Sequence, residues 1–314
     1  MDTHYFKAIC LNVTTYKNIS PLGEQLGGVL QQILETYVPF TTHNLLIEIE
    51  KTNGQYRQLP FSDSAMGLIN TLLSKKELLT LAISDAPNED EDTFPQDFRF
   101  AITLNRAAAF PPETHKNMLF PNEVSFSLSE RLFSNQIPSA VQADFIRLYQ
   151  SLIQLTSGIA GFITYETISA SYEMTTPFEA RYGIRQITPQ PGFHSYVRGC
   201  FWVNFLNRSQ IDALGGIDNV RKQSPGAVIQ MGDTGATIQA TNDINSCTDN
   251  DLNNLSAFLS PLFPPEARDP QFPLLIREES SRGTGLGESS ELVSGGFPAK
   301  VGRRFNASPK KSRR

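Results

Sequence analysis

The sequence predicts an α+β fold with mixed or antiparallel sheets flanked by helices. Strand-like and helix-like segments alternate irregularly, and the glycine-containing segment 232–235 separates two short strand-like runs, as the turn of a β-hairpin does. A doubly wound parallel fold would instead show a regular alternation of strands and helices. A strand–helix–strand order recurs near 8–50 and 124–164, so two similar halves are a further option, although no sequence repeat accompanies them.

Two helices and five strands are predicted in the first half of the chain. Apolar residues recur at helical spacing over 22–38 and give that segment one apolar face. A second helix is predicted over 65–74, where Ser62 or Asp63 is placed to cap it. Apolar or alternating runs predict strands at 8–14, 44–50, 78–84, 98–104 and 124–128.

The second half begins with a clear helix over 141–155, for which Ser139 is the expected cap and Gly158 the expected end. A strand is predicted at 159–164. The run CFWVNFL at 200–206 predicts a buried strand, and two glycines end the short helix expected after it at 209–214. The remaining predicted elements are the hairpin strands at 227–231 and 236–240, and a last helix at 249–262.

Charge is unevenly distributed along the chain. The 27 basic and 32 acidic residues give a net charge of −5, yet residues 277–314 hold nine basic and four acidic residues, a net of +5. Residues 1–276 therefore carry −10. We interpret 1–276 as one α+β domain, with a subdivision near 105–122 as an alternative, and 277–314 as a flexible tail rich in Ser, Gly and basic residues. The acidic body argues against nucleic acid as the main ligand and is compatible with a basic protein partner.

The N-terminal sequence and the cysteines predict a reducing, cytoplasmic environment. MDTHYFKAICLNVTTY lacks the features of a secretory signal, and no apolar stretch approaches the roughly 18 residues of a membrane span. The three cysteines, Cys10, Cys200 and Cys247, are far apart and form no CxxC pair. We expect free thiols, with neither a disulfide framework nor a zinc site.

Motifs that would indicate catalysis are weak. His194 and Cys200 could form a thiol–imidazole pair, but a loop histidine and a core thiol are the simpler interpretation. The segment MGDTG around Asp233 resembles the Asp-Thr-Gly of aspartic proteases in one copy only, within a predicted hairpin turn. We therefore expect no catalytic residue, no metal site and no cofactor.

The segment NEDED at 88–92 is an acidic loop between two predicted strands. One interpretation is a solvated loop that keeps a sheet edge from pairing with another chain. The other is a docking patch for a basic partner, since mobile carboxylates would steer association electrostatically. The candidate contact residues are Asp85, Glu89, Asp90, Glu91 and Asp92.

The segment 178–216 carries the most distinctive pattern in the chain. It contains an Ala-Arg-Tyr-Gly-Ile turn, a Trp-x-Asn-Phe-Leu strand and a short helix that ends in Leu-Gly-Gly. This segment resembles the type VI secretion immunity family, bacterial antitoxin-like proteins formerly of unknown function. Cys200 and Phe201 ahead of Trp202, and the long polar tail, depart from the family pattern. The residues that match the family motif are Arg181, Tyr182, Gly183, Trp202, Asn204, Phe205, Leu214, Gly215 and Gly216.

The motif residues also have a structural interpretation. We expect Trp202 and Phe205 to lie in the core, and the glycines to form turns with positive φ. Asn204, if it points inward, needs backbone partners. The motif would then define the scaffold of the family more than its binding surface.

The resemblance implies an immunity protein that binds a cognate effector toxin, encoded next to it, and covers the active site of the toxin. Because no export signal is present, we expect the toxin to act in the cytoplasm, as a nuclease or another enzyme with a cytosolic target. No small-molecule substrate and no membrane partner are expected. Two other classes stay open: a hydrolase or transferase with an unrecognised site, and a scaffold protein whose basic tail touches nucleic acid or a membrane.

Overall fold

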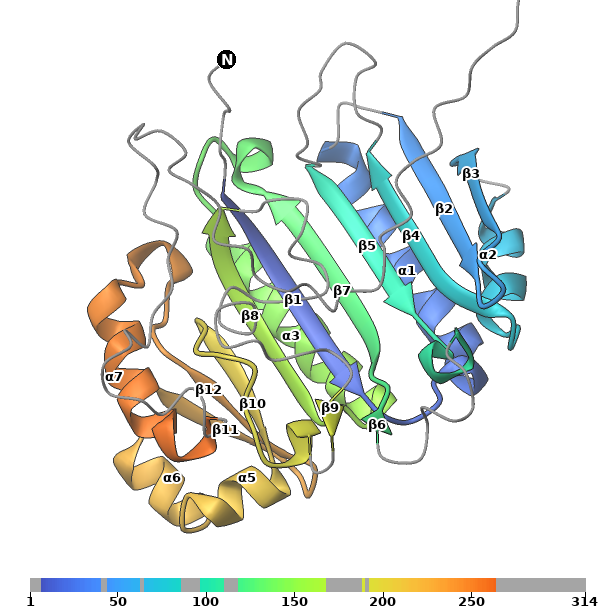
Figure 1. Cartoon of the computed structure of the whole chain (residues 1–314). Helices are drawn as coiled ribbons and strands as arrows, with labels where there is room; N and C mark the ends of the chain where they lie inside the picture. Colours follow the sequence, from blue (N-terminus) through green and yellow to red (C-terminus); the bar gives the residue numbers. More distant parts are fainter. Residues whose placement is uncertain are drawn as a thin grey trace, which may run out of the picture. The chain divides into compact units, whose positions relative to one another are not determined.

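The computed structural model describes residues 7–40, 44–62, 65–85, 97–109, 118–167, 188–189 and 192–263. Within these residues, ten strands form one open antiparallel sheet that carries six α-helices (Figure 1). The predicted α+β class is therefore confirmed. In the same ranges, none of the helices is both long enough and apolar enough to cross a membrane.

The large sheet has the strand order β11-β12-β10-β8-β1-β7-β5-β4-β2-β3, and all of its strand pairs are antiparallel. A separate small sheet joins two residue pairs, β6 (Met118–Leu119) and β9 (Thr188–Pro189). The strands of the large sheet are β1 (Lys7–Thr15), β2 (Leu45–Lys51), β3 (Tyr56–Pro60), β4 (Leu78–Asp85), β5 (Phe98–Thr103), β7 (Asn122–Ser129), β8 (Ala160–Thr167), β10 (Val203–Asn207), β11 (Ala227–Met231) and β12 (Gly235–Gln239).

Both predicted strand–helix–strand units are present, and they differ in how far each one crosses the sheet. Helix α1 (Gly23–Tyr37) connects β1 to β2 across the three strands β7, β5 and β4, whereas α3 (Ser139–Thr156) connects β7 to β8 across β1 alone. Since all neighbours are antiparallel, the two strands joined by each helix run parallel to each other. The first strand in chain order thus lies in the middle of the sheet.

The main core lies between one face of the sheet and helices α1, α2 (Ala65–Leu73) and α3. Alternate residues of β1, among them Ile9, Leu11 and Val13, point into this core. Phe126 of β7 stacks on Phe145 of α3 with ring centroids 4.9 Å apart. In Figure 1, α1 and α3 lie behind the strands.

The remaining helices pack on the opposite face, at the β10–β12 end of the sheet. They are α5 (Arg208–Ala213), α6 (Ile217–Gln223) and α7 (Asp249–Leu259). Within β10, Val203 and Phe205 join the main core, whereas Leu206 joins a second core with Leu255. The face opposite α1–α3 carries polar side chains on β7, β5, β4, β2 and β3, and we call it the polar face.

The structure corrects several expected boundaries. Ser139 is the first residue of α3 and not its cap: Pro138, in an extended conformation, precedes the helix, and no side chain caps it. At the other end, Ser157 and not Gly158 takes the left-handed conformation, with φ 51°. The predicted strand at 200–206 begins only at Val203.

Besides the two-residue strands β6 and β9, the strand β3 and the helix α6 were not predicted. The edge strand β3 is exposed along most of its length and lacks apolar alternation, so only its pairing with β2 identifies it as a strand. Helix α6 has seven residues and starts directly after Gly216. Both elements depend on tertiary neighbours more than on local sequence.

Two domain limits were predicted from the sequence: a subdivision near 105–122 and the start of a tail at 277. Strands β5 and β7, which flank the segment 105–122, pair directly with each other in the large sheet. The predicted tail, 277–314, lies outside the described residues.

Candidate functional site

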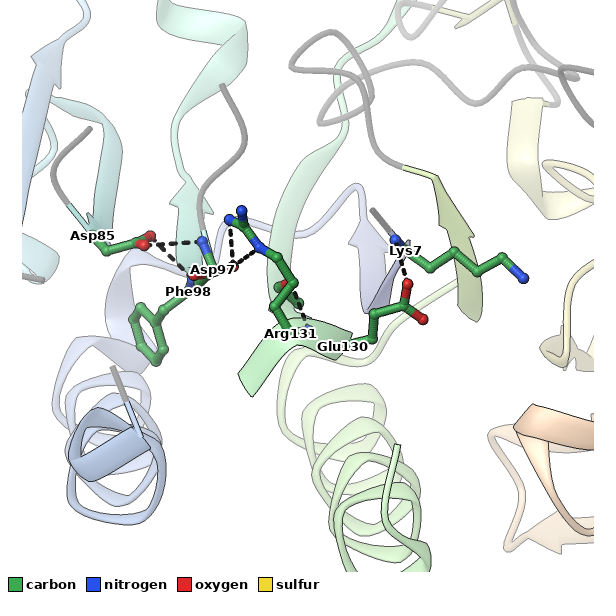
Figure 2. A network of polar contacts seen from close by, with 7 residues as sticks. Lys7, Asp85, Asp97, Phe98, Glu130 and Arg131 are labelled. Atoms are coloured by element: carbon green, nitrogen blue, oxygen red, sulfur yellow. Dashed lines mark hydrogen bonds and ion pairs between the residues drawn. The ribbon is translucent and has the colours of Figure 1, made fainter. Parts of the chain in front are cut away.

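Asp85 anchors one end of the sheet (Figure 2). It is the last residue of β4, and its carboxylate accepts hydrogen bonds from the backbone N–H groups of Asp97, at 2.9 Å, and Phe98, at 3.0 Å. These bonds hold the start of β5 against the end of β4. Burial raises the pKa of the Asp85 carboxyl, and the two N–H donors oppose that shift.

The same end of the sheet contains a chain of charged contacts. The guanidinium of Arg131 donates to Asp97 Oδ1 from Nε at 2.9 Å and pairs with it through Nη2 at 2.7 Å. Glu130 accepts from the backbone N–H of Lys7 at 3.2 Å and from the hydroxyl of Tyr165. We name Lys7, Asp85, Asp97, Glu130 and Arg131 the charged end of the sheet.

One of the five predicted acidic contact residues, Asp85, lies at this end. Asp85 is only 4% exposed, and its carboxylate is engaged by two backbone donors, so it is a structural anchor and no longer a candidate for direct contact. The other four predicted contact residues, Glu89, Asp90, Glu91 and Asp92, lie outside the described residues. The segment that contains them leaves from Asp85 and returns at Asp97, which Asp85 holds close.

A hollow of about 190 Å³ opens on the polar face. One row of residues crosses five strands there, because Glu50 pairs with Tyr56 and Thr80, while Thr103 pairs with Thr80 and Glu123. Small side chains on the central strands form the floor, and longer ones rise on both sides. The lining residues are Glu48, Glu50, Tyr56, Thr80, Arg99, Ala101, Thr103, Glu123 and Ser125.

A buried polar network borders this hollow. Nη1 of Arg198 lies within 2.8–2.9 Å of Asn12 Oδ1, Thr14 Oγ1 and Glu123 Oε1. The side chains of Arg198 and Glu123 are 3% and 6% exposed. Burial lowers the pKa of Arg106, which also feels the opposite charge of Glu123 and the like charge of Arg198. The Glu123 carboxylate therefore lies near two guanidinium groups in the interior.

Comparison with known proteins identifies a shared fold. No protein family and no curated protein matches the sequence. Among solved structures, the Pseudomonas aeruginosa T6SS protein PA0821 is similar, with a TM-score of 0.56 and 14% sequence identity. The alignment covers 82% of this chain and 73% of that protein. The fold is shared with a T6SS protein. At this identity the likeness concerns the fold, and membership of the immunity family is not shown.

The described motif residues from the segment 178–216 have structural positions. Trp202 is 2% exposed, and its indole N–H donates to the carbonyl of Thr241 at 2.9 Å. The amide of Asn204 accepts from the N–H of Phe201 and donates to its carbonyl, which satisfies the buried side chain and explains why β10 starts late. The expectation that Asn204 needs backbone partners is confirmed.

The other motif residues complete this scaffold. Phe205 and Leu214 are buried. Gly215 and Gly216 both have φ of 90°, as expected for glycines that end α5. Arg181, Tyr182 and Gly183 lie outside the described residues. The described part of the motif builds the second core and its junction with the first.

The weak catalytic motifs also have structural explanations. Cys200 is buried, its thiol donates to the carbonyl of Leu252 at 3.2 Å, and burial raises its pKa. Such a thiol is a poor nucleophile at neutral pH. Asp233 lies in the predicted turn between β11 and β12. Within the described ranges, no group of three or more His, Cys, Asp or Glu side chains is arranged to hold a metal ion.

The hollow and the Arg198–Glu123 pair were not predicted from the sequence. Glu123 and Arg198 are 75 positions apart, and the hollow needs the order of five strands. One signal was available. In β5 and β7, every second residue is polar or small, which predicts that one face of the sheet is not an apolar core.

Proposed function

We propose that this chain is an immunity protein that binds a cognate type VI secretion effector and neutralises it by covering its active site. The observation that carries the proposal is the fold shared with a T6SS protein over most of both chains. The sequence resemblance over 178–216 supports the same assignment independently. The effector would act in the cytoplasm, as a nuclease or another enzyme with a cytosolic target.

The acidic character of the chain supports a basic partner. Residues 1–276 carry a net charge of −10. At the charged end of the sheet, Asp85 and Arg131 fix both ends of the segment that contains four further acidic residues, Glu89 to Asp92. Carboxylates in a segment that begins and ends there would attract a basic surface before docking and raise the rate of association.

Co-expression with the product of the adjacent gene tests the proposal. We expect a stable complex in size-exclusion chromatography and restored growth of cells that express the adjacent product. Absence of both a complex and protection would refute the immunity function.

A set of charge variants tests the predicted contact loop. Replacing Glu89, Asp90, Glu91 and Asp92 with their amides should slow association about tenfold at low ionic strength, and less at high salt. The matched control replaces four exposed acidic residues elsewhere with their amides and removes the same total charge. These residues are Glu24, Glu35, Asp212 and Asp218. Equal slowing in both variants would show that net charge, and not this loop, attracts the partner.

A further inference from the structure

The hollow on the polar face has an excess of negative charge. Three carboxylates line it, from Glu48, Glu50 and Glu123, against one guanidinium, from Arg99. Glu123 is engaged by Arg198 and also feels the charge of Arg106, so the charge that remains in the hollow is that of Glu48 and Glu50 against Arg99, a net of −1. A cation entering the hollow is therefore favoured over an anion.

The charges are not equally available to a ligand. Arg99 Nη1 lies 3.7 Å from Glu48 Oε2, and Glu123 is held by Arg198 at 2.9 Å. Within the described part of the chain, no ion pair involves Glu50. The Glu50 carboxylate stands between Tyr56 and Thr80 in the row that crosses the hollow, so it is the acidic group best placed to receive a cation.

Tyr56 adds an aromatic surface at the side of the hollow. Its side chain is 61% exposed, one of the few large hydrophobic residues so exposed in the described ranges. Burial of its hydroxyl raises the pKa of Tyr56, and the negative charge of Glu48 adds to the shift. An aromatic face beside a carboxylate attracts a guanidinium or ammonium group through both the ring and the charge. Tyrosine is also common among the residues that dominate binding at protein interfaces.

We infer that this hollow is a docking point for a basic side chain, arginine above all, of a partner protein. The floor of small residues, Thr80, Ala101, Thr103 and Ser125, leaves space for the end of a long side chain. Arginine fits best because its planar guanidinium can stack on Tyr56 while it pairs with Glu50. The identity of the partner as a toxin rests on the proposed function. The affinity of the hollow for a basic side chain is independent of that function.

A titration with a small probe tests the chemistry directly. Nα-acetyl-arginine amide is added to the full chain, and amide NMR shifts are followed. We expect saturable shifts for residues of the hollow, such as Thr103 and Ser125. The neutral analogue Nα-acetyl-citrulline amide should cause none. Equal shifts with both probes, or none that saturate, would overturn the inference.

Two charge-matched variants locate the site. E50Q should weaken binding of the arginine probe about fivefold, the upper range for a partly exposed ion pair. E35Q removes the same charge from an exposed position on α1 and should leave binding unchanged. Equal affinities for the two variants would place the cation elsewhere on the molecule.

The same variants separate this inference from the proposed function. If the adjacent gene product binds the chain and E50Q weakens neither that complex nor the arginine probe, the docking point is refuted while the immunity function stands. If the arginine probe binds as expected and the adjacent gene product does not, the immunity function fails while the docking point stands.

Discussion

Replacing Glu123 with glutamine removes a carboxylate that lies near two buried guanidinium groups. Arg198 keeps its hydrogen bonds to Asn12 and Thr14, but it loses its ion pair with Glu123, and Arg106 loses the same opposite charge nearby. Breaking a buried ion pair by removing one partner costs about 3–5 kcal/mol. E123Q should therefore lower the free energy of unfolding by that amount. With a urea m value of about 3 kcal/mol/M for a chain of this size, the urea midpoint falls by roughly 1–1.7 M.

Replacing Arg198 with methionine should cost less. The variant loses the three hydrogen bonds to Asn12, Thr14 and Glu123, about 2–3 kcal/mol in total, but Glu123 keeps Arg106 as an opposite charge. The double variant E123Q/R198M no longer places two cations together, so its cost should be at least about 1 kcal/mol smaller than the sum of the two single costs.

Urea denaturation followed by circular dichroism provides the measurement. The control is R208M, which removes an exposed pair with Asp212 on α5 and should cost under about 0.5 kcal/mol. The reasoning is refuted if E123Q costs no more than R208M, or if the costs of E123Q and R198M simply add in the double variant.

Two further predictions concern the thiols and the glycines of α1. Under native conditions, iodoacetamide should label Cys200 far more slowly than the half-exposed thiols of Cys10 and Cys247, because the Cys200 thiol is buried and its pKa is raised. Mass spectrometry would follow the labelling, and all three thiols should react in urea. Comparable native rates would contradict the buried position of Cys200. In α1, Gly28→Ala should raise stability by about 0.5–1 kcal/mol, since a Cβ meets nothing within 4 Å there. Gly23→Ala should lower stability by about 1–3 kcal/mol, because its Cβ would lie 2.9 Å from the backbone of Leu73. Thermal melts that rank the two variants in the opposite order would refute this packing.

Periodicity was sufficient to predict most of the fold. The helices at 22–38 and 141–155 and the strands around them are confirmed because each has one apolar face that must be buried. The hairpin was predictable because its turn needs glycine, and Gly232 indeed has φ of 56°. Local side-chain hydrogen bonds explain a strand boundary that was predicted wrongly. The amide of Asn204 bonds the backbone of Phe201, which therefore does not join the strand pairing of β10.

The candidate site was much less predictable. Asp85 resembles its acidic neighbours in sequence, yet burial and two backbone donors make it an anchor. The hollow depends on which strands are neighbours, and Glu50, Tyr56 and Glu123 meet there only through the strand order of the sheet. Strand order is set by long-range packing, which a single sequence does not encode in any local pattern.

The central position of β1 has a consequence for biosynthesis. Its partners are β7 and β8, and β8 ends at Thr167, so β1 is made long before both of its neighbours exist. At about 5–20 residues per second, a ribosome needs roughly 8–30 s to make the intervening chain. During that time an apolar strand with two open edges is exposed to the cell. The nascent chain is therefore a natural client for chaperones, and slow translation before Thr167 should increase aggregation.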